Sequence, residues 1–338
     1  MFKLPFQNQP PNFPFNSIMG NYFTNLCREL RREATKLGFC AIGFSPPLPQ
    51  QLAVQRYSSM ISEKRHGEME YMEKRIKERA DPTLLLPGLK TIISAAISYN
   101  NTVEYQEGFP KISKYALIED YHTVVRKKLE QLLEKLKTLI TEPCNAIITV
   151  DSAPILEKSL AEKAGIGKPG KNTLLIVPSA GSYIFLGEIL IDKEIIDDRP
   201  TLPNLCGSCR LCIERCPTGA LIEPGRIDAS RCISYLTVEL KREFSEHESA
   251  MIDNWLFGCD LCMEVCPHNR QSIIMADKSF ALRHELMEIR AEHILNLTGS
   301  GFRKLFYGTP LFHIGLKRLK RNAKAVEKNL KKTGKPKK

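Results

Sequence analysis

Most cysteines of this chain fall into one stretch, at spacings that suit iron–sulfur chemistry. Eight of the eleven cysteines lie between residues 206 and 266. The first four, with the proline after them, follow C-x2-C-x2-C-x3-C-P, and a second run, Cys259, Cys262 and Cys266, also precedes a proline. The first spacing is that of bacterial ferredoxins, whose thiolates hold 4Fe–4S clusters. We therefore predict a ferredoxin-like module with two such clusters.

The same pattern predicts which thiolates share a cluster, because the fourth cysteine of a run ligates the other cluster. The first set contains Cys206, Cys209, Cys212 and Cys266. The second contains Cys216, Cys259 and Cys262, and Cys232 is the nearby cysteine that completes it. The alternatives are zinc, which favours separated C-x2-C pairs, and disulfides, which need an oxidising compartment.

Outside the cysteines, Asp151 is the side chain best placed for acid–base work. It follows an apolar strand-like run and precedes Ser-Ala-Pro, so it is either a helix N-cap or a general acid at the end of a strand. His122 is interpreted as a residue that opens a helix, with metal ligation as the alternative. The glycine-rich loop 165–171 fits neither G-x-G-x-x-G nor a Walker A sequence, and a plain turn explains it.

The net charge of +11 is concentrated near the C-terminus. Residues 317–338 contain eleven Lys and Arg and one Glu, so 11 − 1 gives +10. Such a segment indicates a nucleic-acid contact or a solvated, partly disordered tail. No apolar run is long enough to span a membrane, and residues 1–17 lack the apolar core of a secretory signal. We expect no membrane association and a cytoplasmic location.

Apolar periodicity predicts the elements that must position these residues. Helices are expected over residues 21–37, 50–62, 67–79, 120–140 and 154–164. Strands are expected over residues 39–44, 89–99, 146–150, 174–177 and 183–191, the last two joined by a tight turn at residues 180–182. Cys27, Cys40 and Cys144 are isolated and are expected in the core.

Several short motifs occur together in one order. Before the cysteines they are Lys114-Tyr-Ala, Asp120-Tyr-His, Val150-Asp-Ser-Ala-Pro, Ala164-Gly-Ile-Gly, Gly170-Lys-Asn-Thr and Leu186-Gly-Glu. Around the cysteines they are Cys206-Gly-Ser-Cys-Arg-Leu-Cys, Cys216-Pro-Thr-Gly-Ala, Arg231-Cys-Ile-Ser-Tyr-Leu-Thr and Phe257-Gly-Cys-Asp-Leu-Cys. With these motifs the chain resembles the epoxyqueuosine reductases over roughly residues 21–325.

The resemblance implies a reaction and its cofactors. Epoxyqueuosine at the wobble position of tRNA with a GUN anticodon would lose its epoxide oxygen and become queuosine, the last step of queuosine biosynthesis. Cobalamin would act in the N-terminal domain, reduced through the two 4Fe–4S clusters. Asp151 matches the family's proton donor, and this role predicts a pKa raised by burial. Leu175, Leu186, Ser234 and Asp260 match cobalamin contacts, and the glycine-rich loop would let the corrin approach the backbone.

The expected fold class is α+β. We predict a flexible extension over residues 1–20, an α/β cobalamin-binding domain over 21–200, a ferredoxin-like 4Fe–4S domain over 201–275 and a basic helical region over 276–338 that contacts tRNA. This last region is a truncated form of the family's HEAT-like helices, and Lys168-Pro169 replaces an aromatic residue of many relatives. A monomer with an external flavodoxin- or ferredoxin-type electron donor is expected. The alternatives are a reductase of another substrate, akin to reductive dehalogenases, and a non-catalytic two-cluster electron carrier.

Overall fold

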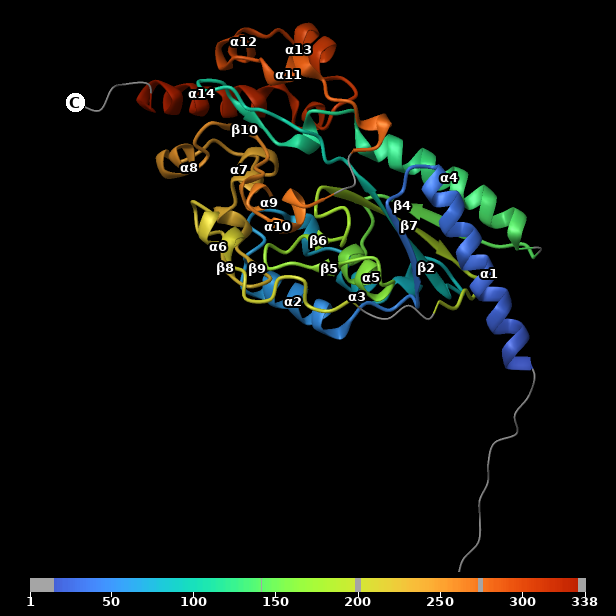
Figure 1. The fold of residues 1–338 in the computed structure, drawn as a ribbon. Coiled ribbons are helices and arrows are strands. Elements are labelled where there is room, and N and C mark those ends of the chain that lie inside the picture. The colour runs from blue at the N-terminus through green and yellow to red at the C-terminus, as the bar shows by residue number, and fades with distance from the viewer. Residues whose placement is uncertain (1–14, 141, 198–201, 273–275, 334–338) are drawn as a thin grey trace, which may run out of the picture.

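A four-stranded sheet forms the centre of the computed structural model, which describes residues 15–140, 142–197, 202–272 and 276–333 (Figure 1). The strands lie in the order β1 (Ala41–Ser45), β2 (Thr91–Ser98), β7 (Ile184–Ile191) and β4 (Ala146–Thr149). Every pairing in this sheet is antiparallel, with Ala95 opposite Gly187 in the central pair. Antiparallel pairing is typical of α+β folds, so the sheet agrees with the expected α+β class and not with the narrower α/β description of this domain.

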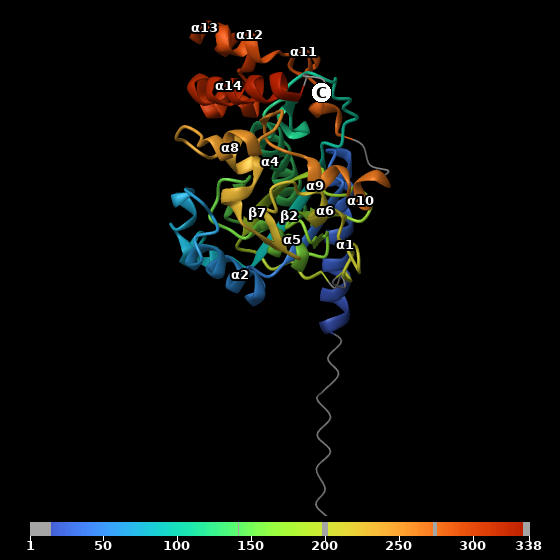
Figure 2. The ribbon, with the colours of Figure 1, turned by 90° about the vertical axis from the view of Figure 1, so that its left-hand side faces the viewer.

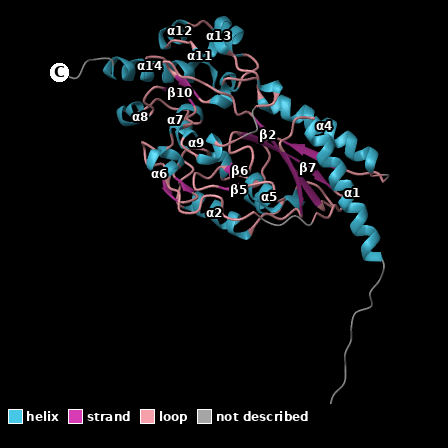
Figure 3. Ribbon diagram, in the orientation of Figure 1, coloured by secondary structure: helices cyan, strands magenta, loops and turns pink. Residues whose placement is uncertain are grey.

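Helices cover both faces of this sheet (Figure 3). On one face, α1 (Phe15–Lys36) and α4 (Tyr121–Leu139) pack on the sheet. On the other face lies the short helix α5 (Glu157–Lys163). Neighbouring residues of β2 pack against the helices on opposite faces of the sheet, because side chains alternate along a strand. Ile93 belongs to the core under α1 and α4, whereas Ile92 packs with Leu160 of α5.

The predicted elements are largely present, with two corrections. Residues 67–79 form only a turn of 3-10 helix, Glu70–Met72, and the short helix α3 (Ile76–Ala80), while α2 covers Gln51–Ser62. The predicted strand 174–177 is reduced to β6 (Leu175–Ile176), which pairs with β5 (Lys168–Pro169). The tight turn predicted between it and strand 183–191 is present, with Val177 bridged to Gly181. Both edges of β7 are already occupied by β2 and β4, so β6 has no place beside it.

The cysteine-rich module consists of short elements that pack against the rest of the chain. They are α6 (Leu211–Arg215), β8 (Leu221–Glu223), β9 (Arg226–Ile227), α7 (Ile233–Val238), α8 (Glu246–Met251), β10 (Trp255–Phe257), α9 (Leu261–Glu264) and α10 (Pro267–Arg270). β10 pairs in parallel with β3 (Lys111–Ile112), a strand from the N-terminal half. Arg65 adds a second connection, since its Nη1 donates to the Ile227 carbonyl at 2.9 Å.

The C-terminal region is helical, as predicted. It contains α11 (His284–Met287), α12 (Ala291–Asn296), α13 (Gly299–Phe306), a 3-10 segment η6 (Pro310–Ile314) and α14 (Gly315–Thr333). These helices lie together at the end of the molecule next to the cysteine-rich module (Figure 2). Residues 1–14 of the predicted extension 1–20 are not among the described residues. The remaining part is not an extension, because α1 begins at Phe15.

The solvated-tail interpretation of the basic segment is wrong for residues 317–332. Val326 is fully buried, and α14 packs against α12 and β10. Arg321 is also buried, and its guanidinium donates to the carbonyls of Leu240 (2.6 Å) and Leu236 (3.0 Å). The surroundings of Arg321 therefore satisfy its donors within the protein. In the described part of the chain, no helix combines the length and apolarity that a bilayer crossing requires.

Candidate functional site

The cysteines of the predicted cluster module lie at the ends of short helices. Cys212 and Cys262 lie within α6 and α9, two helices that contact each other. Cys216 follows α6, and Cys232 and Cys266 are the N-cap residues of α7 and α10. The prolines after Cys216 and Cys266 prevent each short helix from continuing through its last cysteine. The spacing in the sequence thus directs several thiols towards one small region.

The electrostatic neighbours of the thiols follow the two predicted sets. The pKa of Cys212 is raised by burial and by the charges of Cys206, Cys266 and Cys209. The pKa of Cys259 is raised by burial and by Cys232 and Cys262. Cys262 also lies close enough to Cys212 for their charges to interact, so the two groups adjoin. This grouping is compatible with the predicted ligand sets, and ligation itself stays a prediction.

Asp151 follows β4 by two residues and has an unusual backbone conformation. Its φ is +59°, in the left-handed region that non-glycine residues rarely adopt. It is not a helix N-cap, because α5 begins six residues later and its N-cap is Leu156. Its side chain is 57% exposed. Strained, exposed backbone at a strand end is typical of functional positions, and here the N-cap alternative does not account for it.

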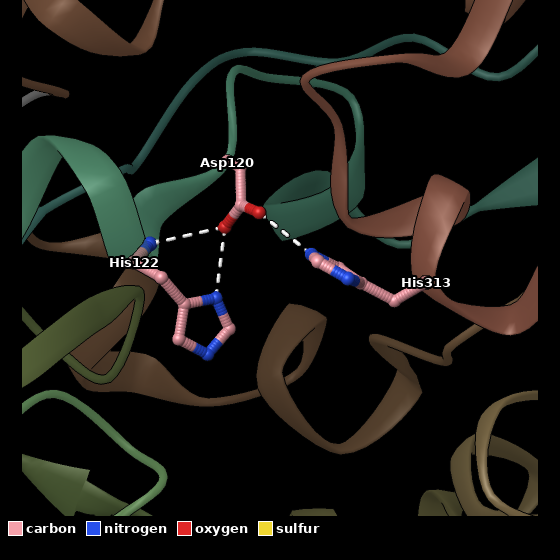
Figure 4. Close-up of side chains that lie close together, drawn as sticks. All are labelled: Asp120, His122 and His313. Carbon is pink, nitrogen blue, oxygen red and sulfur yellow. Dashed lines mark hydrogen bonds and ion pairs between the residues drawn. The ribbon is translucent and has the colours of Figure 1, made fainter. Parts of the chain in front are cut away.

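The partners of Asp151 come from the start of α4. The Tyr121 hydroxyl donates to Asp151 Oδ2 at 2.9 Å, and His122 Nε2 lies 3.4 Å from the same oxygen. The other ring nitrogen of His122 contacts Asp120 Oδ1 at 2.8 Å (Figure 4). Asp120 is the N-cap of α4, and its Oδ1 also accepts the His122 backbone N–H at 3.0 Å. His122 therefore lies between two carboxylates.

These contacts set the protonation states of the group. Asp120 and Asp151 raise the pKa of His122 to about 9, so it is an imidazolium at neutral pH. Hydrogen bonds from His122 and Tyr121 lower the pKa of Asp151 despite the opposing effect of burial. The prediction of a raised pKa for Asp151 is thus wrong for this arrangement, because two donors stabilise the carboxylate. The dissociable proton next to Asp151 resides on His122.

A pocket of about 140 Å³ connects Asp151 with other predicted residues. Its lining includes Leu175 on β6 and Leu186 on β7, together with Tyr121 and Glu157. Burial and the charge of Asp151 raise the pKa of Glu157 to about 7. A larger hollow of about 610 Å³ lies between α1 and α4, but it is lined mainly by charged side chains of helix surfaces. The smaller pocket, which brings Asp151 together with Leu175 and Leu186, is therefore the candidate site.

Two residues predicted to contact cobalamin lie outside that pocket lining. Ser234 lies on α7 and is partly buried. Asp260 is 1% exposed, and its carboxylate accepts hydrogen bonds from Ser113 Oγ and from the Lys114 backbone N–H at 2.7 Å. Burial raises the pKa of Asp260 to about 6. Its side chain thus connects the cysteine-rich module to the loop before α4, and this contact accounts for both of its oxygens.

The surroundings of the pocket fit a large amide-bearing cofactor in part. The pocket wall is apolar at Leu175, Leu186 and Phe185. Asn172 Nδ2 and the Tyr183 hydroxyl are buried without a hydrogen-bond partner in segments next to this lining, although neither residue belongs to the lining itself. The glycine-rich loop has a different explanation. A Cβ at Gly167 would lie 2.7 Å from Leu175 Cγ, so this glycine permits packing of the β5–β6 hairpin, and the corrin approach to the loop stays a prediction.

Sequence reasoning missed some members of this site. His122 was interpreted as a helix-opening residue, although Asp120-Tyr-His was recognised as a motif. His313 of η6 lies 2.6 Å from Asp120 Oδ2 through its Nε2, and no local pattern indicates this contact (Figure 4). Asp120, His122 and His313 form a close group among the described residues. One carboxylate oxygen of Asp120 and one ring nitrogen of each histidine all lie within 4.8 Å of one another.

Two family models match this chain. A model of a 4Fe–4S double cluster binding domain matches residues 205–269, and one described as epoxyqueuosine reductase QueG matches residues 79–152. An epoxyqueuosine reductase of Cellulophaga algicola is 36% identical over 293 residues, 87% of this chain and 95% of that protein. One of Escherichia coli (strain K12) is 36% identical over 306 residues, 88% of this chain and 79% of that protein.

Solved structures show the same similarity. A selenomethionine-labelled epoxyqueuosine reductase has a TM-score of 0.84 at 30% identity, over 91% of this chain and 83% of that chain. An epoxyqueuosine reductase with an epoxyqueuosine-modified tRNA-Tyr stem loop has a TM-score of 0.84 at 29% identity, over 91% of this chain and 82% of that chain. A Bacillus subtilis epoxyqueuosine reductase has a TM-score of 0.78 at 28% identity, over 91% of this chain and 82% of that chain. In that structure the catalytic aspartate loop is swung out of the active site.

Proposed function

This chain belongs to the epoxyqueuosine reductase family, and from that premise we propose that it reduces epoxyqueuosine to queuosine at the wobble position of tRNA. The observation that carries the proposal is the match to 95% of a relative's length at 36% identity, which includes both the cysteine-rich module and the Asp151 motif. A solved relative binds an epoxyqueuosine-modified tRNA stem loop, which supports tRNA as the partner of this chain.

The reaction removes the epoxide oxygen as water and consumes two electrons and two protons. Both carbon–oxygen bonds break, and a carbon–carbon double bond forms. Cobalamin, when bound, supplies strongly reducing cobalt chemistry, and the two clusters supply its electrons. The thiolates of the two cysteine sets would hold the clusters. An external electron donor of the flavodoxin or ferredoxin type and a monomeric state belong to this proposal.

The residues of the pocket have separate tasks in this proposal. Leu175 and Leu186 form an apolar wall against which the cofactor would lie, and Ser234, outside this lining, would contact the cofactor from the cysteine-rich module. Asp260 supports the loop of Lys114, because its oxygens are already engaged there. Apolar walls exclude water and strengthen the electrostatic effects of the remaining polar groups.

Asp151 delivers a proton to the leaving oxygen in this proposal. In the structure its carboxylate is ionised, and His122 holds the proton beside it. His122 Nε2 passes a proton to Asp151 Oδ2 across the 3.4 Å contact, and the neutral carboxyl then donates it at the substrate. Tyr121 stacks on Phe185 at 4.1 Å and keeps its hydroxyl directed at Asp151. A positioned acid of this kind typically contributes about 10²–10⁴-fold to a rate.

The exposed lysines of α14 form the proposed tRNA surface. Lys317, Lys324 and Lys328 lie on the solvent side of the helix, whereas Ala325 and Val326 are buried. Phosphate contacts by lysine supply most of the non-specific affinity for nucleic acids. Truncation from Lys324 onward would also remove the buried part of α14. Charge reversal at exposed lysines therefore tests this surface better than a deletion does.

The test of the proposed function is direct turnover. Protein with reconstituted clusters is incubated without oxygen with cobalamin, a strong reductant and tRNA that carries epoxyqueuosine. The nucleosides are then digested and weighed by mass spectrometry. Loss of one oxygen from the modified base is the expected result. If clusters and cobalamin are bound and the base keeps its oxygen, the substrate is a different one and the proposal is wrong.

A further inference from the structure

The loop that carries Asp120 is held by the C-terminal region. The Asp120 backbone N–H donates to the carbonyl of Gly308 at 2.8 Å, and the Arg283 N–H donates to the carbonyl of Leu117 at 2.8 Å. Arg283 Nη1 also reaches the Tyr307 carbonyl at 3.3 Å. Segments that follow the cysteine-rich module thus fix the start of α4, which bears Tyr121 and His122. The proposed tRNA-binding region is therefore also part of the scaffold of the acid.

One side chain makes this connection inside the hydrogen-bonded group itself. His313 Nε2 lies 2.6 Å from Asp120 Oδ2, and the two residues are 193 positions apart in the sequence. Asp120 Oδ1 accepts from the backbone and from the ring of His122. Both carboxylate oxygens are therefore occupied from opposite sides, as Figure 4 shows, and the carboxylate cannot rotate without losing contacts. A fixed acceptor in turn fixes the ring of His122.

We propose that His313 is a positioning residue for proton delivery: it orients Asp120, and through Asp120 and His122 it holds Asp151 in place for its reaction. This inference rests on the proposed function, in which Asp151 is the proton donor. It assigns the C-terminal region a part in the chemistry in addition to RNA binding. His313 acts through other residues, and the pocket lining does not include it.

The conformation of Asp151 explains why such support matters. Its side chain is more than half exposed, its backbone is left-handed, and its side-chain contacts are to Tyr121 and His122. A B. subtilis relative has its catalytic aspartate loop swung out of the active site. The fraction of molecules with Asp151 held in place then depends on how firmly His122 is oriented.

Kinetics of two variants at position 313 test the proposal. His313→Ala removes the contact, whereas His313→Gln retains an Nε2 donor at a similar reach and lacks a titratable ring. For His313→Ala we expect kcat to fall about tenfold, the effect of one hydrogen bond to a charged group, with KM for tRNA changed less than about twofold. His313→Gln should recover most of kcat. His293→Ala is the control, since His293 is an exposed histidine of α12.

A second measurement reads the hydrogen-bonded group without turnover. The protein has seven histidines, so ¹³C-histidine NMR can follow each ring through a pH titration, with the spectrum of His122→Gln assigning the signal of His122. Neither variant at position 313 carries a charge there, so their difference isolates the hydrogen bond. If His313 orients Asp120, the pKa of His122 will be lower in His313→Ala than in His313→Gln by about one pH unit. The charged groups facing His122 are Asp120, Asp151 and His313.

The two measurements separate the possible failures. Equal pKa values of His122 in both variants would overturn the proposal, whatever the substrate is. A His122 signal that shifts as expected, in a protein without turnover, would leave the positioning role intact and overturn the proposed function. An increase in KM for tRNA with kcat unchanged would make His313 an RNA contact and would also overturn the proposal.

Discussion

Two aspartates of this protein occupy opposite environments. Asp151 is more than half exposed, has a left-handed backbone and has a pKa lowered by His122 and Tyr121. Asp260 is 1% exposed, accepts from Ser113 and Lys114, and has a pKa raised to about 6 by burial. Both matched functional positions in the sequence. Asp151 lines a pocket, and Asp260 joins two parts of the chain.

The difference shows what each carboxylate can contribute. A side chain that is fully enclosed by protein donors stabilises the fold but has no free route to a substrate. A side chain held by a protonated histidine and a tyrosine hydroxyl at the rim of a pocket can exchange protons. Replacement of Asp151 should therefore change catalysis, and replacement of Asp260 should change stability.

The largest effect is expected for Asp151→Ala. We expect kcat to fall about 10²–10⁴-fold, because the proton donor is lost, with tRNA affinity unchanged and only a small loss of thermal stability from the missing contacts to His122 and Tyr121. Anaerobic turnover with mass spectrometry of the nucleosides measures kcat, and a melting curve measures thermal unfolding. The isosteric Asp151→Asn, which keeps an oxygen acceptor for Tyr121, is the matched variant. Full turnover in both variants would remove Asp151 from the mechanism.

Asp260→Ala should reverse this pattern. It leaves the Ser113 hydroxyl and the Lys114 N–H buried without an acceptor, which costs about 2–4 kcal/mol of unfolding free energy. Denaturant unfolding under anaerobic conditions measures this loss. Cobalamin retention by the folded fraction is the accompanying readout. If stability is unchanged and cobalamin is lost, Asp260 is a cofactor contact and the assignment to structure is wrong.

The pH dependence distinguishes the group around Asp151 from the rest of the protein. The interaction of the His122 imidazolium with its two carboxylates is complete below the unfolded pKa of about 6.5 and is lost as pH rises through about 9. We expect thermal stability to decline between about pH 6.5 and pH 9, and turnover to decline above about pH 9, where His122 loses its proton. His122→Gln has no imidazolium to lose, so its turnover should not show this fall. The ratio of the turnover rates of the unchanged protein and His122→Gln should therefore change as pH rises through about 9. A constant ratio would contradict the protonation state assigned to His122.

The smallest effect is expected on the exposed face of α14. Lys324→Glu combined with Lys328→Glu should weaken tRNA binding about tenfold and lower the salt dependence of affinity, with kcat unchanged at saturating tRNA. The control is Lys127→Glu with Lys135→Glu, which makes the same charge change on exposed positions of α4. Filter binding at several salt concentrations measures both. Equal losses in the two pairs would indicate a general charge effect without a tRNA surface on α14.

Local patterns were enough for several parts of this protein. The period of apolar residues in 120–140 predicted α4, and a run of buried β-branched residues predicted β2, because these signals depend on neighbours in the sequence. The position of Asp151 after a strand was also predictable. Its pKa was not, since the two donors that lower it come from another element.

The sequence by itself determined the chemistry that the chain can carry. The spacing of eight cysteines and two prolines, and the motifs around Asp120 and Asp151, are properties of short segments. Tertiary structure alone decided that β7 lies between β2 and β4, that Asp260 is enclosed, and that His313 reaches Asp120 across 193 residues. The physical reason is that these contacts depend on which surfaces the folded chain buries together, and no local pattern encodes the partner of a buried or bridging side chain.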